Sequence, residues 1–185
     1  MNSVVFLPIF YKEVEQVILV NKKDKAIGKE EKMKAHLQGK LHRAFSVFLI
    51  NKKGEVLIQK RAKSKYHSAG LWTNTCCSHP RPKEKVGQAA KRRLKEEMGI
   101  ETDLKKVFSF IYKAKLGNLV EYEFDHVFLG RFDGKPRPNK KEVESWKWIK
   151  LADLRTDIKK NPQKYTFWFK IIFGKVKGKV KKIKK

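Results

Sequence analysis

VGQAAKRRLKEEMGI, residues 86–100, has the spacing of an amphipathic helix followed by a helix-ending glycine. Its small and apolar residues stand at Val86, Ala89, Ala90 and Leu94, a spacing that gathers them on one face of a helix. Gly99 is the residue type that most often follows the last turn of a helix. The sequence therefore predicts a helix over residues 86–98, with Arg93 and Glu97 one turn apart on a shared face.

A second informative segment precedes this helix. Residues 71–80 read LWTNTCCSHP and combine an indole, two thiols and an imidazole between turn-forming stretches. One interpretation is a buried corner of the core, because unpaired cysteines are among the most buried residues. The other is a reactive site, which is favoured by His36 and His42 upstream and by Glu121-Tyr122-Glu123 beyond the helix.

The rest of the chain reads mainly as strands. Apolar and alternating runs separated by turn residues predict strands within residues 13–20, 41–50, 55–61, 71–77, 106–115, 119–132 and 144–149. Further helices are expected at residues 151–160 and 161–173, and residues 29–38 are expected to be loop or a frayed helical turn. This order predicts an α+β fold, an α/β/α sandwich in which a mixed sheet is flanked by helices.

Length and composition predict one domain. The 185 residues suit a single domain over residues 1–174, followed by a lysine-rich tail, residues 175–185, that we expect to be disordered. No apolar run approaches the about 20 residues of a membrane span, and residues 1–10 make a poor signal peptide. Cys76 and Cys77 are neighbours, so a disulfide between them would be strained. These features predict a cytoplasmic protein.

The net charge of +26 is extreme. It could form a surface for nucleic acid or anionic membrane, because lysine-rich surfaces bind polyanions. It could also be a solvated lysine excess, which is favoured because the lysines are spread over every segment without an RNA-reading motif. We therefore expect no specific nucleic-acid partner, and at most weak contact of the tail with an anionic membrane.

Residues 78–100 resemble the Nudix box, whose spacing is Gly, five residues, Glu, seven residues, then Arg-Glu-apolar-x-Glu-Glu-x-Gly-apolar. The matching residues are Glu84, Arg92, Leu94, Glu96, Glu97, Gly99 and Ile100. Ser78 replaces the glycine and Arg93 replaces a glutamate that hydrolases of this family use to bind metal. A Nudix-type diphosphate hydrolase is therefore a disfavoured alternative.

Several segments together resemble the type I isopentenyl-diphosphate isomerases, a divergent Nudix-fold family, over residues 16–169. They are LHRAF at 41–45, KRAKSK at 60–65, GLWTNTCCSHP at 70–80, EEMG at 96–99 and EYE at 121–123. The resemblance implies an enzyme that moves a double bond between isopentenyl and dimethylallyl diphosphate. A non-enzymatic polyanion-binding protein on the same fold is a third hypothesis.

The resemblance also implies two metal sites. One divalent ion, Mn²⁺, Mg²⁺ or Zn²⁺, would be bound by His36, His42, His79, Glu121 and Glu123. Three imidazoles and two carboxylates suit such an ion, and Glu121 and Glu123, two apart on a strand, point to the same side. A second ion, Mg²⁺, would be held by Glu97 and the diphosphate. His67 and His126 have no counterpart in the family site, so we expect them to be ordinary histidines.

By the same resemblance, Cys77 and Glu123 would add and remove protons on opposite faces of the substrate, with Tyr112 near the carboxylate. Cys76 would be a packing residue. Trp168 would stabilise the tertiary carbocation, because an indole is the best cation–π partner, and Trp72 would line the pocket. The residues expected to bind the diphosphate are Lys32, Arg61, Lys65 and Arg93. We expect a monomer.

Overall fold

The computed structural model describes residues 14–183, and the sheet in it is built around β3 (His42–Ile50). Antiparallel neighbours of β3 are β1 (Gln16–Val20), β4 (Glu55–Arg61) and β6 (Cys76–Ser78). β8 (Leu119–Arg131) pairs with β3 in parallel, so that His42 lies opposite Glu123. The signal-peptide prediction for residues 1–10 falls outside the described part of the chain.

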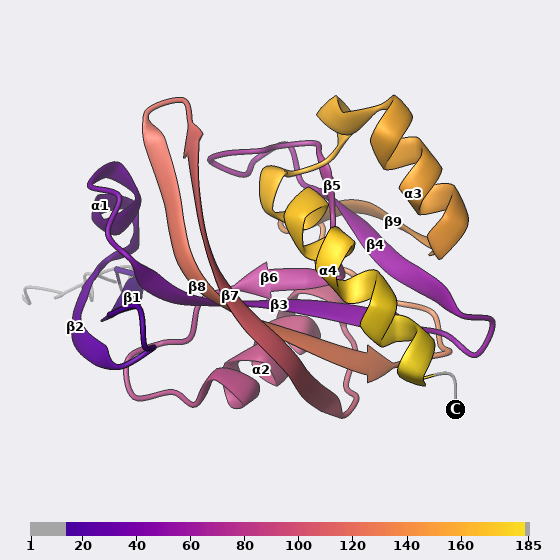
Figure 1. Ribbon diagram of the computed structural model, residues 1–185, viewed down its shortest axis with the longest axis horizontal. Coiled ribbons are helices and arrows are strands. Elements are labelled where there is room, and N and C mark those ends of the chain that lie inside the picture. Colours follow the sequence, from indigo (N-terminus) through magenta and orange to yellow (C-terminus); the bar gives the residue numbers. More distant parts are fainter. Residues whose placement is uncertain (1–13, 184–185) are drawn as a thin grey trace, which may run out of the picture.

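The other strands extend this sheet on either side (Figure 1). β2 (Ala26–Glu31) pairs with β1, and β7 (Leu104–Leu116) forms a long hairpin with β8 that turns at Gly117. β5 (Trp72–Thr73) and β9 (Val143–Lys150) both pair with β4. The result is a curled, mixed, nine-stranded sheet.

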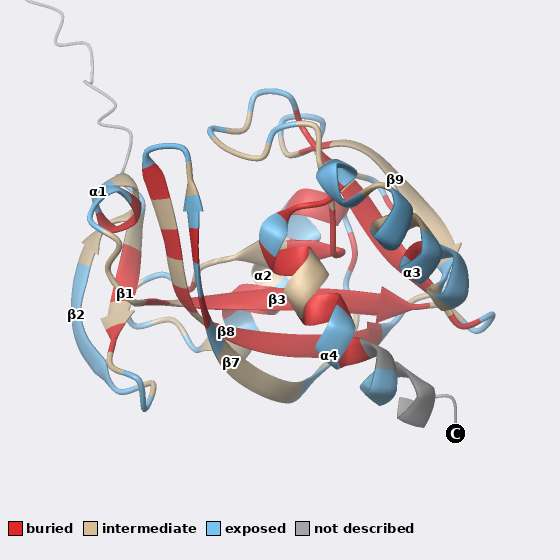
Figure 2. Cartoon of the chain, turned by 45° about the horizontal axis from the view of Figure 1, so that its top comes forward, coloured by how far each residue is buried: buried red, intermediate tan, exposed pale blue. Residues whose placement is uncertain are grey.

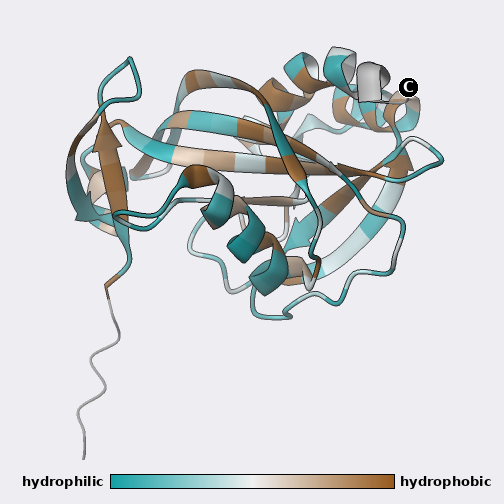
Figure 3. Cartoon of the chain, turned by 90° about the horizontal axis from the view of Figure 1, so that it is seen from below, coloured by the Kyte–Doolittle hydropathy of each residue, from teal (hydrophilic) through white to brown (hydrophobic). Residues whose placement is uncertain are grey.

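Helices cover both faces of the sheet, as Figure 3 shows. α2 (Val86–Met98) packs on one face, where Val47 and Leu49 join its core. α3 (Leu151–Lys160) and α4 (Phe167–Ile183) pack on the other, where Phe48 and Ile50 are buried. Because successive strand residues point to opposite faces, β3 supplies both cores and is buried along most of its length (Figure 2). The predicted α/β/α sandwich is confirmed.

Local signals placed several elements correctly. α2 and α3 occupy the predicted ranges, and Gly99 ends α2 in the left-handed conformation, with φ +65°. Residues 29–38 differ from the prediction, because they form the end of β2 and a short helix, α1 (Lys32–Leu37). The side chain of Glu31 caps α1 by accepting from the backbone of Met33 and Lys34.

The C-terminal helix also differs from the prediction. A 3₁₀ turn occupies Pro162–Lys164, and α4 runs from Phe167 to Ile183, into the tail that was expected to be disordered. The reason is packing: Val176 is fully buried against the core of this face, and lysine itself is a good helix former. Within residues 14–183, none of the helices has the length and apolar character needed to cross a membrane.

Candidate active site

A cavity of about 760 Å³ lies beside the end of β3 that carries His42. Strands β3, β6, β7 and β8, the loop between β4 and β5, and helices α2 and α4 all contribute residues to its wall. The sequence-predicted site residues that line it are Lys32, Arg61, Lys65, Cys77, His79, Arg93, Tyr112, Glu121, Glu123 and Trp168.

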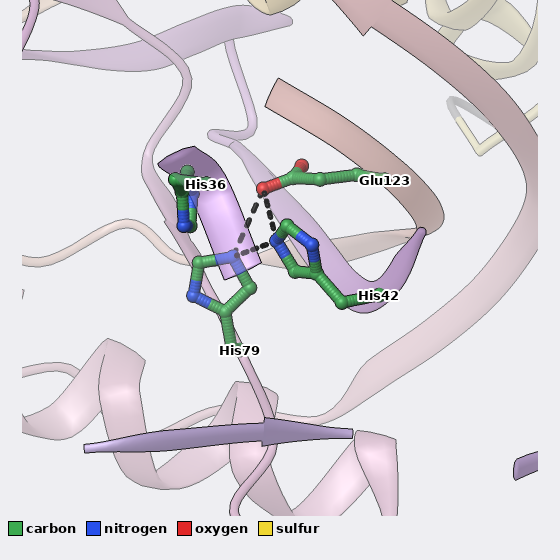
Figure 4. Close-up of side chains that lie close together, drawn as sticks. All are labelled: His36, His42, His79 and Glu123. Carbon is green, nitrogen blue, oxygen red and sulfur yellow. Dashed lines mark hydrogen bonds and ion pairs between the residues drawn. The ribbon is translucent and has the colours of Figure 1, made fainter. Parts of the chain in front are cut away.

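Three imidazoles and one carboxylate meet next to this cavity (Figure 4), and two residues of this cluster, His79 and Glu123, line it. His79 Nε2 lies 2.9 Å from Glu123 Oε1 and 3.2 Å from His42 Nε2. His42 Nε2 lies 3.7 Å from the same Glu123 oxygen. The parallel pairing of β3 and β8 places His42 and Glu123 side by side, and α1 supplies His36.

The donor atoms of this cluster fit a divalent ion. His36 and His42 each direct Nδ1 to a backbone carbonyl, of Lys32 at 2.7 Å and Lys40 at 2.8 Å, so Nε2 is left with its lone pair facing the cluster. His36 Nε2 is buried and has no hydrogen-bond partner among the described residues. Neighbouring ligands about 2.1 Å from an octahedral ion lie about 3 Å apart, close to the spacing seen.

Glu121 stands beside this cluster on β8. Its Oε1 lies 3.6 Å from His36 Nε2 and 2.8 Å from His67 Nε2, and its Oε2 accepts a hydrogen bond from Tyr112 at 3.3 Å. His67 was expected to be an ordinary histidine, but the structure places it in the cavity wall beside Glu121, on the loop between β4 and β5. His126, as expected, lies outside the cavity and is buried against Asp24.

The protonation states follow from burial and neighbouring charges. Burial lowers the pKa of His36 and His79, and His42 lowers both further although Glu121 opposes this. Burial would raise the pKa of Glu123, but the hydrogen bond and charge of a protonated His42, with the hydroxyl of Tyr112, outweigh it and lower the pKa to about 2. Glu123 in turn raises the pKa of His42 against its burial, and an ion bound in the cluster would replace that proton on Nε2. Glu123 is thus a carboxylate, and Tyr112 donates to it at 2.6 Å.

Cys77 lies on β6, directly across from Ser46 of β3, and lines the cavity. Burial raises the pKa of its thiol to about 12, so the group carries its proton at neutral pH. Cys76 points the other way and is fully buried in the core under α2. The structure therefore separates the two thiols into one that faces the cavity and one that packs.

Six lysine and arginine side chains of the described residues line the cavity, and each of the four expected to bind the diphosphate contacts an acidic or aromatic neighbour. Lys32 pairs with Glu15. Lys65 lies 2.7 Å from Glu142, and Arg93 contacts both Glu142 at 3.2 Å and Glu97 at 2.7 Å. The Arg61 guanidinium lies 5.4 Å from the centre of the Trp168 ring. Glu142 was missed by sequence reasoning, since it stands in a loop without a recognisable motif.

Glu97 and Trp72 do not line the cavity. Glu97 lies behind Arg93, with its second oxygen held by the Gln59 amide at 3.0 Å. Trp72 was expected in the pocket, but side chains alternate along β5. Thr73 is the fully buried residue of the two, and the ammonium of Lys147 lies 4.7 Å from the centre of the Trp72 ring. Thr73 is the hydrogen-bond acceptor of the Trp168 indole, at 3.0 Å.

Comparison with known proteins agrees with this geometry. The NUDIX domain family matches residues 40–169. Isopentenyl-diphosphate Delta-isomerase 1 of Aromatoleum aromaticum is 56% identical over 163 residues, which cover 88% of this chain and 92% of the relative. Isopentenyl-diphosphate Delta-isomerase 2 of Photorhabdus laumondii is also 56% identical, over 86% of this chain and 91% of the relative. The chain belongs to this isomerase family, within the Nudix proteins.

Solved structures support the fold of the isomerase family member described above. The DR0079 protein of Deinococcus radiodurans has a TM-score of 0.67 and 21% identity, over 80% of this chain and 90% of that one. A MutT protein of Methanosarcina mazei has a TM-score of 0.62 and 18% identity, over 73% and 91%. At this level of identity the likeness concerns the fold alone.

Proposed function

We propose that this chain interconverts isopentenyl diphosphate and dimethylallyl diphosphate. One observation carries the proposal: a protonated thiol, an ionised carboxylate and six lysine and arginine side chains share a single cavity. Curated relatives named isopentenyl-diphosphate isomerase, 43–56% identical to this chain, support isomerisation over the hydrolase alternative.

The reaction adds a proton to one carbon of the double bond and removes one from another, so that no net proton is gained. Cys77 and Glu123 are the proposed proton-transfer groups. A thiol whose pKa is about 12 holds its proton, and a carboxylate whose pKa is about 2 can accept one from a carbocation. Tyr112, which donates to Glu123, fixes the orientation of the carboxylate.

A divalent ion, Mn²⁺, Mg²⁺ or Zn²⁺, would be held by His36, His42, His79, Glu121 and Glu123 and would supply Lewis-acid charge beside the cavity. This proposal is supported by the fit of the donor atoms described above. Glu97 would bind a second ion, Mg²⁺, together with the diphosphate. Because Glu97 lies behind Arg93, the Arg93 side chain would have to move aside for this ion to bind.

The substrate's two ends call for different surroundings. The diphosphate would contact Lys32, Arg61, Lys65 and Arg93, because charge-assisted hydrogen bonds to phosphate are strong. The hydrocarbon end would lie toward Trp168, whose indole is held in place by Thr73 and could stabilise a cation through its ring face. Water has to be excluded there, since it would capture the carbocation.

The proposal is tested by incubating the purified protein with isopentenyl diphosphate, Mg²⁺ and Mn²⁺ in deuterated water. Proton NMR should show the dimethylallyl isomer carrying deuterium, while phosphorus NMR shows an intact diphosphate. Release of phosphate would favour the hydrolase instead. Unchanged substrate with a folded, metal-loaded protein would reduce the family relationship to a shared fold.

We further propose that the protein works in the cytoplasm as a monomer. Its contact with anionic membranes would be weak and would use the lysine-rich residues 175–185. Lys175 and Lys179 are exposed on α4, and each lysine near an anionic surface contributes about 1 kcal/mol. Partitioning to phosphatidylserine vesicles should therefore fall with added salt and with deletion of residues 175–185. Salt-insensitive partitioning, or none, would contradict this contact.

A further inference from the structure

A histidine in the loop between β4 and β5 contacts one of the proposed metal ligands. The side chain of His67 is only 9% exposed, and its Nε2 lies 2.8 Å from Oε1 of Glu121. We propose that His67 is a positioning residue of the metal centre, whose Nε2–H holds the Glu121 carboxylate in the orientation that binds the ion. This inference rests on the metal centre proposed above.

The contact with Glu121 calls for a hydrogen on Nε2 of His67, because a carboxylate oxygen 2.8 Å away can only accept. The Ser68 hydroxyl, 3.3 Å from Nδ1, can donate to the lone pair that this tautomer leaves there. A ring nitrogen that carries hydrogen has no lone pair for a metal. His67 therefore differs from His36 and His42, which direct Nδ1 to backbone carbonyls and leave Nε2 open toward the cluster.

Glu121 needs such support because the neighbouring strand β7 holds its carboxylate only weakly. Tyr112 on β7 reaches Oε2 at 3.3 Å but donates to Glu123 at the shorter distance of 2.6 Å. The 2.8 Å contact to His67 is shorter than the contacts of Glu121 with Tyr112 and with His36, the latter at 3.6 Å. Hydrogen-bond partners of this kind orient metal ligands, and their loss commonly weakens metal binding by roughly 10–100-fold.

The His67 ring is itself held in place. It stands edge-on to the Trp168 indole, with centroids 5.7 Å apart at an angle of 89°, and its backbone carbonyl accepts a hydrogen bond from Arg61 at 3.1 Å. A phenylalanine ring would keep the edge-on packing but would lack the donor. A glutamine would place an amide N–H near the position of Nε2.

The experiment uses the full chain stripped of metal and measures the affinity for Zn²⁺ alone by competition with a chelator. We expect His67→Phe to bind Zn²⁺ roughly 10–100-fold more weakly than the natural protein. His67→Gln should recover most of this loss, because it restores the donor. His126→Gln, at a buried histidine outside the cavity, serves as the matched control and should bind as the natural protein does.

Unchanged affinity in a folded His67→Phe variant, checked by circular dichroism, would overturn the inference. So would a His67→Gln variant as weak as His67→Phe, because packing or direct ligation would then explain the loss. If His67→Phe does not fold, His67→Leu takes its place as the variant without a donor. Failure of the natural protein to bind Zn²⁺ would instead overturn the metal centre itself, so the two failures are distinguishable.

Discussion

Adjacent residues can have opposite roles when they lie on a strand. Cys76 and Cys77 follow one another on β6, so their side chains point to different faces. Cys76 enters the core under α2, and Cys77 enters the cavity. The same side chain, a cysteine thiol, therefore packs in the core at one position and faces the cavity at the next.

This difference predicts the outcome of two alanine substitutions. Cys77→Ala should lower kcat roughly 10²–10⁴-fold, because a proton donor is lost. The matched variant Cys76→Ala should keep its kcat and lose about 1 kcal/mol of unfolding free energy, because it only leaves a small cavity. Isomerase assays and urea denaturation of both variants measure these effects. Full activity in Cys77→Ala would reject the proton-transfer role.

At the scale of single residues, the sequence located those residues whose types are themselves informative. The three histidines and Glu123 come together as expected. His67 and Glu142 were missed because their places depend on how two loops fold back over the cavity. The expected position of Trp72 was wrong. Its strand, β5, is so short that the sequence does not show which of its side chains faces the cavity.

The helix α2 illustrates how an element can carry charge into the site. Arg93 lies between Glu97 and Glu142 and contacts both, and all three side chains are largely buried. Removing the guanidinium would leave the buried Glu97 with only the Gln59 amide, while Glu142 would keep its ion pair with Lys65. Such uncompensated charge is costly in a buried setting.

Arg93→Ala should therefore lower the free energy of unfolding by about 2–3 kcal/mol, after allowance for partial exposure. Lys91→Ala on the same helix is the matched control, because Lys91 is half exposed and forms an exposed ion pair with Asp103. That variant should unfold at the same urea concentration as the natural protein. Equal midpoints for both variants would show that the Arg93 contacts contribute no stability.

Helix ends were predictable where local signals mark them and unpredictable where tertiary contacts decide. α2 ends at Gly99, which adopts the left-handed conformation, and the position is restricted to glycine because an added side-chain carbon would lie only 2.7 Å from the Arg137 carbonyl oxygen. α4 passes two glycines, Gly174 and Gly178, and still continues. Burial of Val176 against the sheet favours continuation, which composition alone does not reveal.

On the scale of the whole molecule, one buried histidine links the β1–β2 hairpin to the sheet. His126 on β8 contacts Asp24 in the hairpin at 3.0 Å, and Arg43 on β3 contacts the same carboxylate at 2.7 Å. Burial lowers the pKa of His126 to about 4, and Lys106 and Arg43 add to this although Asp24 opposes it. In the unfolded chain the pKa returns to about 6.5.

The sign of the pH effect follows from these two values. Above about pH 6.5 the histidine is neutral in both states, and its contribution to stability is complete. As the pH falls from about 6.5 toward 4, the unfolded chain binds a proton that the folded one does not. At about pH 5 the free energy of unfolding should be about 2 kcal/mol lower because of this residue. Urea denaturation above about pH 6.5 and at about pH 5 should show a smaller loss of unfolding free energy for His126→Gln than for the natural protein. Identical losses in the two proteins would contradict the prediction.

Strand positions could be predicted from sequence, but strand partners could not. The alternation of residues 119–132 indicates a strand, whereas its parallel pairing with β3 joins segments far apart in the chain. Ser46 and Asp125, which hydrogen-bond across that pairing, are 79 positions apart. Short-range patterns carry no information about which distant strand a given strand pairs with. The family resemblance predicted the fold as a whole.

The parallel pairing of β3 and β8 also has a consequence for the order of folding. The histidines and carboxylates of the cluster come from α1, β3, β8 and the segment after β6, and they can meet only once distant strands have joined. Closing such long loops is slow compared with forming hairpins and helices. A divalent ion would thus find its ligands assembled only late in refolding, and would stabilise the finished sheet without guiding its formation.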